Sequence, residues 1–434
     1  MPNLKLKIPT PIDWPTMAIN QVCLIVSRGT APIYVSNSSI YVIGQRCVQI
    51  SGFDQSAARP HNETKLERVL WVKQGDILLN CTIGRSCIFT AENNAYIVDG
   101  HVTLIRPNKE QLDGGWLNAL LQSHYGQSHL EIYCYSGSTN QVELSKEALA
   151  TSYIPLPPPS EQQHIAHILD ILDTQIQHTE QLIGKLKQIK LGLLHDLLTR
   201  GIDENGEMRD PVAHPEKFKK SAVGNIPREW NVGKFETLAN VIDPQPSHRA
   251  PAEVVGGEPY IGVGDLRADG SINFESCRKV SPKAVTKQQQ RFSIEVGDII
   301  FGKIGTIGFP QFLPQGIRYA LNANTVLIKP KHCPSYVLWL LRSSFVEKQI
   351  QMQIHSTTQP AFGIQRIRAM LVPLPSKNEQ HRISTILDSH SARLVTEESH
   401  LAKLKQLKKG LMHDLLTGRV RVTSLIAESE LLCI

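Results

Sequence analysis

The stretch "GLLHDLLT" spans residues 192–199, and "GLMHDLLT" spans residues 410–417, an offset of 218 positions. The same offset holds without a gap from Ile154 to Thr199 and from Val372 to Thr417, and 22 of these 46 aligned positions are identical. Self-similarity of this extent indicates a tandem duplication. The two copies are therefore expected to share one local structure.

Each copy predicts one long helix. Both open with Pro-Leu-Pro, which is incompatible with a helix interior, and we predict Ser160 and Asn378 as the N-caps that follow. Glu161 and Glu379 then fall in the first turn, where a carboxylate meets the positive end of the helix dipole. Each helix is expected to run for about 40 residues to a glycine and to span roughly 60 Å.

Apolar residues recur at three- and four-residue steps along both copies. A single apolar stripe on so long a helix needs a partner, and the two matching stripes can pair with each other as an antiparallel coiled coil. The positions that we expect in this helix pair include Ile165, Leu169, Leu186, Ile383, Leu387 and Leu404.

Each helix also carries an adjacent histidine and aspartate near its end, His195–Asp196 and His413–Asp414. One hypothesis is a catalytic base oriented by a carboxylate. The other is a helix-end pair that bonds to the neighbouring helix or to a partner. Consecutive helical residues point about 100° apart, which suits a dyad poorly, and no nucleophile motif accompanies either copy. We favour the second hypothesis and predict no catalytic residue.

A strand-rich region precedes each helix, and the two regions resemble each other. "VKQGDILLNCTIG" (72–84) parallels "IEVGDIIFGKIGTIG" (294–308), and "VTLIRP" (102–107) parallels "TVLIKP" (325–330). Both pairs predict strands bounded by turns. "GKIGTIG" lacks the Walker pattern and a following helix, so a strand-to-strand turn is predicted there instead of a phosphate loop. The chain is thus predicted to be a mixed α/β protein in which a strand-rich domain followed by a long helix occurs twice.

Composition limits the class of protein. The formal net charge of +6 permits a nucleic-acid partner without requiring one. The eight cysteines show no CxxC spacing and no histidines at metal-site intervals, so free thiols and no metal site are expected. Pro9 and Pro11 interrupt the place of a signal-peptide core, and no apolar run approaches a membrane span. A cytoplasmic protein is expected.

Several motifs together resemble the DNA-specificity (S) subunit of type I restriction-modification systems. They are "PLPPPSEQQHIAHILD", "KLKQIKLGLLHDLLTRGIDENGEMRDP", "VGNIPREWNVGKFETLA", "GDIIFGKIGTIG", "STTQPAFG" and "PLPSKNEQHRISTILD". The resemblance covers nearly the whole chain. It implies two target-recognition domains separated by two antiparallel helices with pseudo-two-fold symmetry, and a bipartite, asymmetric DNA site. The corresponding boundaries are 1–157 for the first recognition domain, 158–201 for the central helix, 202–375 for the linker and second recognition domain, and 376–434 for the distal helix and tail.

The resemblance also implies the partners. These are double-stranded DNA, two methyltransferase subunits docked on the long helices, and restriction or translocase subunits reached through the complex. The chain itself is then non-catalytic and has no cofactor, because S-adenosylmethionine is bound by the methyltransferase. The helix-pair positions, together with His195, Asp196, His413 and Asp414, are the docking candidates. The alternative is a stand-alone DNA-binding or coiled-coil scaffold protein without such partners, although a pure scaffold needs no pair of large, divergent strand-rich domains.

Candidate DNA contacts are Arg, Lys, Asn, Gln and other polar side chains in predicted turns, because such groups read base edges and phosphates. In the first domain they are Gln45, Arg46, Arg85, Asn93, Asn94, His101 and Gln141. In the second domain they are Arg267, the run Lys287 to Arg291, Lys303, Thr306, Asn324 and Gln359. For each of these candidates an ordinary solvated surface residue is the alternative. We favour Lys303, Thr306 and Gln359 among them, because they lie in the motif turns.

Overall fold

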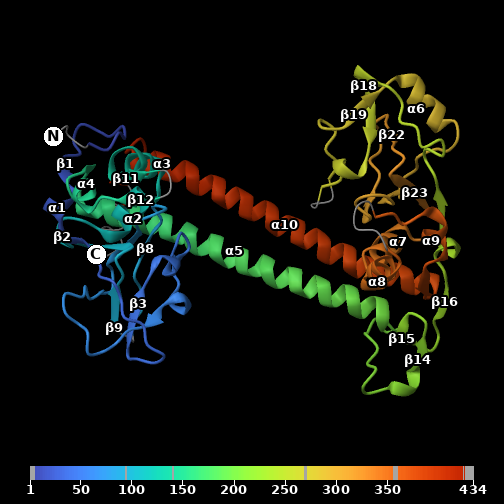
Figure 1. The fold of residues 1–434 in the computed structure, drawn as a ribbon, viewed down its shortest axis with the longest axis horizontal. Coiled ribbons are helices and arrows are strands. Elements are labelled where there is room, and N and C mark those ends of the chain that lie inside the picture. The colour runs from blue at the N-terminus through green and yellow to red at the C-terminus, as the bar shows by residue number, and fades with distance from the viewer. Residues whose placement is uncertain are drawn as a thin grey trace. The chain divides into compact units, whose positions relative to one another are not determined.

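The computed structural model describes residues 5–92, 95–138, 141–267, 271–354, 360–423 and 425. Its contacts divide into two compact units (Figure 1). Unit 1 comprises Met1–Leu182 and Glu397–Ile434, and unit 2 comprises Ile183–Thr396. The boundaries fall inside both long helices. Each unit therefore contains one strand-rich domain and a half of each helix.

The two long helices are α5 (Pro159–Thr199, 41 residues) and α10 (Lys377–Leu416, 40 residues), which confirms their predicted length. The predicted N-caps are wrong, because both helices begin earlier and Ser160 and Asn378 lie inside the first turn. Ser376 caps α10 instead, since its hydroxyl accepts the Glu379 N–H at 3.2 Å. Pro159 occupies the first helical position of α5, where a missing N–H costs nothing.

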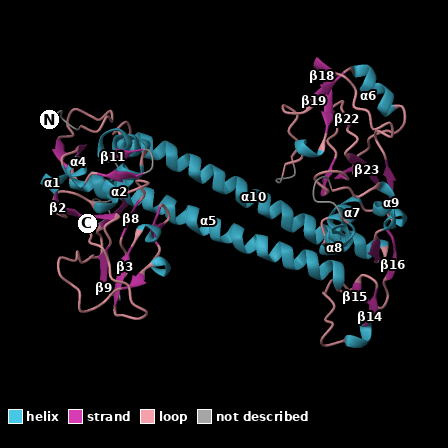
Figure 2. Ribbon diagram, in the orientation of Figure 1, coloured by secondary structure: helices cyan, strands magenta, loops and turns pink. Residues whose placement is uncertain are grey.

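The main sheets of the two units have the same strand order, which confirms the duplication. Figure 2 shows the strands of both strand-rich domains in magenta and the long helices in cyan. All neighbouring strands in both sheets are antiparallel. In unit 1 the order is β2 (Cys23–Arg28), β10 (Val102–Pro107), β7 (Ile77–Asn80) and β8 (Ser86–Ile88). In unit 2 it is β17 (Ala239–Ile242), β23 (Thr325–Pro330), β20 (Ile299–Gly302) and β21 (Gly308–Phe312). The segment "GKIGTIG" is thus the turn between β20 and β21, as predicted.

Smaller sheets repeat as well. A three-stranded sheet with one parallel pair consists of β6 (Arg59–Pro60), β3 (Ile40–Ile43) and β9 (Ala95–Val98) in unit 1, and of β19 (Arg278–Val280), β18 (Glu253–Ile261) and β22 (Ala320–Leu321) in unit 2. The strand leading into each long helix pairs with an earlier one: β13 (Tyr153–Pro155) with β1 (Thr16–Ala18), and β24 (Leu371–Leu374) with β16 (Asn231–Lys234).

The remaining elements are short. The helices are α1 (Ile19–Val22), α2 (Gly114–Gln122), α3 (His124–His129), α4 (Lys146–Ala150), α6 (Pro282–Gln289), α7 (Pro334–Leu341), α8 (Ser344–Gln353) and α9 (Ile364–Ala369). The hairpins are β4–β5 (Val48–Gln49 and Gly52–Phe53), β11–β12 (Tyr135–Ser138 and Gln141–Leu144) and β14–β15 (Phe218–Ser221 and Gly224–Pro227).

The long helices complete the core of each unit. In unit 1, Ile165 and Leu169 of α5 and Leu415 of α10 are buried in one cluster with Trp116 of α2. In unit 2, Leu197 of α5 and Ile383 and Leu387 of α10 are buried with Tyr336 of α7. Burying one such leucine or isoleucine contributes about 1.5–3 kcal/mol. Part of each apolar stripe therefore anchors a strand-rich domain in addition to pairing the helices.

Equivalent buried ion pairs occur at the N-terminus of each long helix. Glu161, only 2% exposed, accepts hydrogen bonds from the guanidinium of Arg421, which follows α10. Glu379, 3% exposed, accepts from Arg209, which follows α5. Each pair ties the start of one long helix to the chain that leaves the other. The helix-dipole role predicted for both glutamates is therefore only part of their function.

Candidate nucleic-acid interface

In unit 1, several turns meet at one end of the main sheet. Asn80 holds them together: its side-chain Nδ2 donates to the Gln45 carbonyl at 3.3 Å, and its backbone N–H donates to the Arg85 carbonyl at 2.8 Å. The next residue, Cys81, donates its N–H to the His101 carbonyl at 3.0 Å. We call these turns, residues 45–47, 80–85 and 100–101 with strand β12, the turn edge of unit 1. Four candidate DNA-contact residues of the first domain, Gln45, Arg46, Arg85 and His101, are thus brought together.

Arg46, Arg85 and His101 are exposed on this edge, and Gln45 is half-buried. Arg85 donates to the Gln49 side-chain oxygen at 3.3 Å, a long hydrogen bond that leaves most of the guanidinium available. Gln141 lies in β12, but its side chain is outside the described residues, as are Asn93 and Asn94. Arg46 and Arg85 are accordingly the two exposed arginines of the turn edge.

Two carboxylates accompany these cations. A hydrogen bond from Arg28, at 2.8 Å, lowers the pKa of Glu143, which also lies 3.4 Å from a ring nitrogen of His101. Burial raises the pKa of Asp99, whose side chain accepts the His101 N–H at 2.8 Å. Glu143 is therefore ionised but neutralised by Arg28, so it opposes a nearby phosphate only weakly.

In unit 2, Lys303, one of the favoured DNA-contact candidates, is buried and not on the surface of the turn. Its side chain is only 3% exposed, and its ammonium lies 3.1 Å from a carboxylate oxygen of Asp243. The structure thus gives Lys303 a structural partner that the sequence did not predict, and a direct DNA contact by this buried, paired ammonium stays a prediction. The neighbouring Thr306 is exposed in the β20–β21 turn, and Gln359 is outside the described residues.

The other candidates of the second domain separate into exposed and structural residues. Arg267 and Arg291 are exposed, and Arg291 makes long hydrogen bonds to the carbonyls of Pro244 and Asp243. Gln288, from the "KQQQR" run, is buried and bonds to the backbone of Pro244 and Leu321. The run is thus a mixture of a structural amide and surface cations. Asn324 is exposed, and its backbone carbonyl accepts the Lys303 N–H.

Phe309 is a candidate that the sequence did not reveal. In unit 1 Ile88 pairs with Ile77, and in unit 2 Phe312 pairs with Ile299, the residue equivalent to Ile77 in the repeat. Phe309 lies three residues before Phe312, as Arg85 lies three residues before Ile88. Phe309 therefore takes the position that Arg85 has in unit 1. The ring is 49% exposed, and the backbone has a positive φ of 52°, which is strained for a bulky residue. Such strain concentrates at functional positions, and an apolar ring can contact a thymine methyl group. Aligning "TIGR" (82–85) with "TIGF" (306–309) is the signal that could have identified it.

The His-Asp pairs do not form dyads in the described contacts. His413 shares a hydrogen bond of 2.9 Å with the Tyr125 hydroxyl, while Asp414 pairs with Arg419. Asp196 pairs with Arg200, and His195 is exposed. The helix-end hypothesis is therefore supported for unit 1, where the histidine bonds to a neighbouring helix.

The docking candidates on the apolar stripe are mostly inaccessible. Ile165, Leu169, Leu186, Ile383 and Leu387 are buried, and Leu404 is half-buried. The apolar residues that α5 and α10 expose are different ones, among them the repeat-equivalent Ile189 and Leu407, at 50% and 51% exposure. A partner protein that bound the long helices would therefore contact these exposed residues and not the buried apolar stripe.

The described residues contain neither a metal site nor a membrane-spanning helix. No group of three or more His, Cys, Asp or Glu side chains within the described ranges could hold a metal ion. In the part of the chain that the structure describes, no helix has an apolar stretch long enough to cross a bilayer. The fold and surface thus define a duplicated α/β protein with a polar turn edge, and no metal or membrane element among these residues.

Comparisons with known proteins identify the family. The model of the type I restriction modification DNA specificity domain matches residues 11–188 and 227–406. The MjaX type I restriction enzyme specificity subunit of Methanocaldococcus jannaschii is 24% identical over 434 residues, with 95% of each chain covered. The EcoBI specificity subunit of Escherichia coli is 25% identical over 265 residues, which cover 57% of this chain and 53% of that one. The crystal structure of the S subunit from M. genitalium has 15% identity and a TM-score of 0.57, with 94% of this chain and 98% of that chain covered.

Because the family model matches both halves, the chain belongs to the type I restriction-modification DNA specificity family. The resemblance stated from the sequence motifs is therefore confirmed.

Proposed function

We propose that this chain selects the DNA site of a type I restriction-modification complex and performs no chemistry itself. The main support for this proposal is that one sheet topology occurs twice but presents different side chains at equivalent positions, Arg85 in unit 1 and Phe309 in unit 2. Two readers with one fold and unlike contacts suit a bipartite, asymmetric target. Each domain then reads one half-site, in the way that a duplicated reader contacts successive half-sites of a duplex.

The proposed partners are double-stranded DNA and two methyltransferase subunits, through which restriction subunits join. S-adenosylmethionine would be bound by the methyltransferase, which flips the target adenine out of the duplex. Ile189 and Leu407 support two docking surfaces, since each is an exposed apolar side chain on a long helix and they are equivalent in the repeat. One methyltransferase subunit per copy of the unit is the simplest arrangement.

Adenine methylation in the host tests this function. Deleting the gene is expected to remove N6-methyladenine from one bipartite motif, and restoring the wild-type chain should restore it. Single-molecule sequencing of host DNA measures both outcomes. A methylation pattern that is identical with and without the chain, in a host that makes the methyltransferase subunit, would contradict the proposal.

Phe309→Ala should relax recognition in the second half-site only. Loss of a specific base contact is expected to cost about 1–3 kcal/mol of discrimination at that position. The measurement is binding of the full chain, with its methyltransferase subunits, to targets altered one base pair at a time. Arg85→Ala is the matched variant and should change the first half-site only. A uniform loss across both half-sites for Phe309→Ala would show that the residue is structural.

A further inference from the structure

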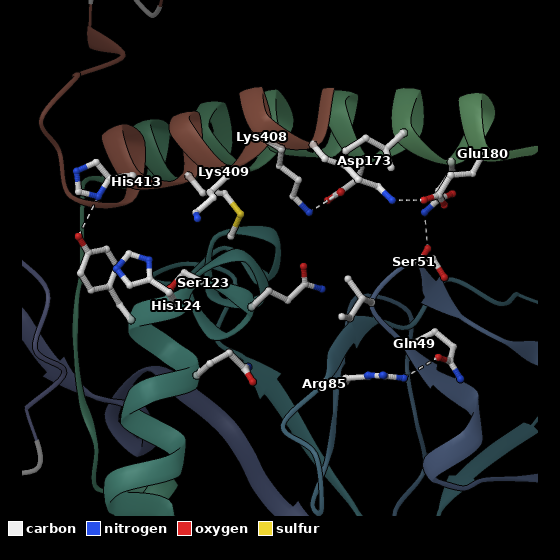
Figure 3. Close-up of a pocket in the computed structure, with 18 residues that line it drawn as sticks. Gln49, Ser51, Arg85, Ser123, His124, Asp173, Glu180, Lys408, Lys409 and His413 are labelled. Carbon is white, nitrogen blue, oxygen red and sulfur yellow. Dashed lines mark hydrogen bonds and ion pairs between the residues drawn. The ribbon is translucent and has the colours of Figure 1, made fainter. Parts of the chain in front are cut away.

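A cleft opens in unit 1 between the turn edge and the long helices (Figure 3). Its volume is about 620 Å³. One wall consists of the β4–β5 hairpin, the turn that carries Arg85, and the junction of α2 and α3; the other consists of α5 and α10. Contacts across it fix its shape: Gln177 of α5 donates to the Ser51 carbonyl at the hairpin tip, and the Tyr125 hydroxyl of α3 shares a hydrogen bond of 2.9 Å with His413 of α10. We call it the basic cleft.

The charges of the basic cleft do not cancel. Lys405 is paired with Glu180 at 2.7 Å, and Lys408 is paired with Asp173, so these four groups are mutually neutral. Lys409 points from α10 into the cleft in Figure 3, and none of the described residues forms an ion pair with it. Arg85 lies on the opposite wall, and among the described residues its guanidinium bonds to Gln49 alone. Two positive charges are thus left facing one space, which favours an anionic occupant.

This cleft continues from the turn edge proposed to contact DNA, because Arg85 belongs both to that edge and to the cleft wall. Duplex DNA carries one negative charge per about 1.7 Å of its axis, so a duplex read at Arg85 brings phosphates next to it. A backbone that passes from Arg85 into the cleft would meet Lys409 on the other wall.

The cationic position is specific to one copy of the repeat. Leu191 of unit 2 stands where unit 1 has Lys409, and Ser391 stands where it has Asp173. Trp339 of unit 2 takes the place of Ala119 of unit 1. The Trp339 indole N–H donates to Asp388 at 2.7 Å, and the Lys190 ammonium lies 5.0 Å from the Trp339 ring. The duplicated fold thus tolerates a leucine at the position of Lys409.

We propose that the basic cleft holds the DNA sugar-phosphate backbone beside the first half-site, with Lys409 as a phosphate contact. The proposal rests on the proposed function and adds a contact made by the long helix, outside the strand-rich domain. A phosphate contact carries no sequence information, so Lys409 should contribute equally to binding of any duplex.

The test is Lys409→Leu in the full chain, measured by fluorescence anisotropy of a labelled 30-base-pair duplex of random sequence over a range of KCl concentrations. Affinity is expected to fall by about 3- to 10-fold, and the slope of log affinity against log salt should decrease in magnitude by about 0.9. Lys403→Leu is the control, because it removes the same charge from an exposed position of α10 that does not line the cleft.

The possible outcomes separate the two proposals. If the wild-type chain does not bind duplex DNA at all, with or without methyltransferase subunits, the proposed function fails. If it binds but Lys409→Leu and Lys403→Leu behave alike, only the cleft proposal is overturned. If Lys409→Leu binds DNA normally but no longer retains the methyltransferase subunit during purification, the cleft docks protein and the phosphate assignment is wrong.

Discussion

Replacing Glu379 with alanine is expected to lower the free energy of unfolding of unit 2 by about 3–5 kcal/mol, the usual cost of breaking a buried ion pair from one side. The carboxylate has three donors: the Ile202 N–H at 2.9 Å, Arg209 at 2.5 Å and the Trp230 indole N–H at 2.9 Å. Alanine leaves all three without that acceptor in a buried site. Hydrogen exchange of unit 2 peptides during urea titration measures the loss.

Two variants give this prediction its controls. Glu379→Gln keeps an acceptor oxygen but loses the charge, so an intermediate loss is expected. Glu161→Ala removes the equivalent pair in unit 1, where Arg421 is more exposed and is also bonded to Asp13 at 2.9 Å, so a smaller loss is expected there. A free energy of unfolding for Glu379→Ala within about 1 kcal/mol of the wild-type value would refute the argument, because a single neutral hydrogen bond contributes that much.

The duplication made much of the fold predictable from the sequence. The offset of 218 positions located both long helices, and the paired "GDI" and "VTLIRP" motifs located strands that occupy the same places in the two sheets. These signals are local, because a helix or strand is determined mainly by the spacing of its own apolar residues. The N-cap predictions fail for a local reason too. Helix α5 already begins at Pro159, and Ser376 caps α10, so in both helices the cap precedes the predicted residue.

The partners of charged groups were not predictable in the same way. Glu161 and Glu379 bond to arginines that follow the opposite long helix, and no spacing rule connects such distant positions. The basic cleft likewise combines Arg85 with Lys409, which are remote in sequence. Phe309 was not predictable from residue type, because it has no hydrogen-bonding group and its backbone conformation and exposure are visible only in three dimensions. Residue type indicates what a side chain can do, and tertiary structure decides whether it is free to do it.

Lys303 is the clearest example of a side chain whose role is decided by its tertiary contacts. Its substitution should reduce the stability of unit 2 more than it changes DNA recognition. Lys303→Ala is expected to lower the free energy of unfolding of unit 2 by about 2–4 kcal/mol, through loss of a buried ion pair and of a packed aliphatic stem. The ammonium is paired with Asp243, and the Lys303 backbone also anchors the turn, since its N–H donates to Asn324 at 2.8 Å and its carbonyl accepts from Phe362 at 2.7 Å. Urea unfolding of the full chain, resolved by hydrogen exchange, measures the effect.

A double variant distinguishes this structural role from direct DNA contact. Lys303→Met with Asp243→Asn replaces the pair by neutral groups of similar volume, which often restores stability, so the double variant is expected to be more stable than Lys303→Ala. If the ammonium serves only Asp243, the double variant should also keep the wild-type preference in the second half-site. Normal stability combined with lost discrimination at one base pair would instead restore Lys303 as a reader of DNA, because a base contact contributes to recognition without supporting the fold.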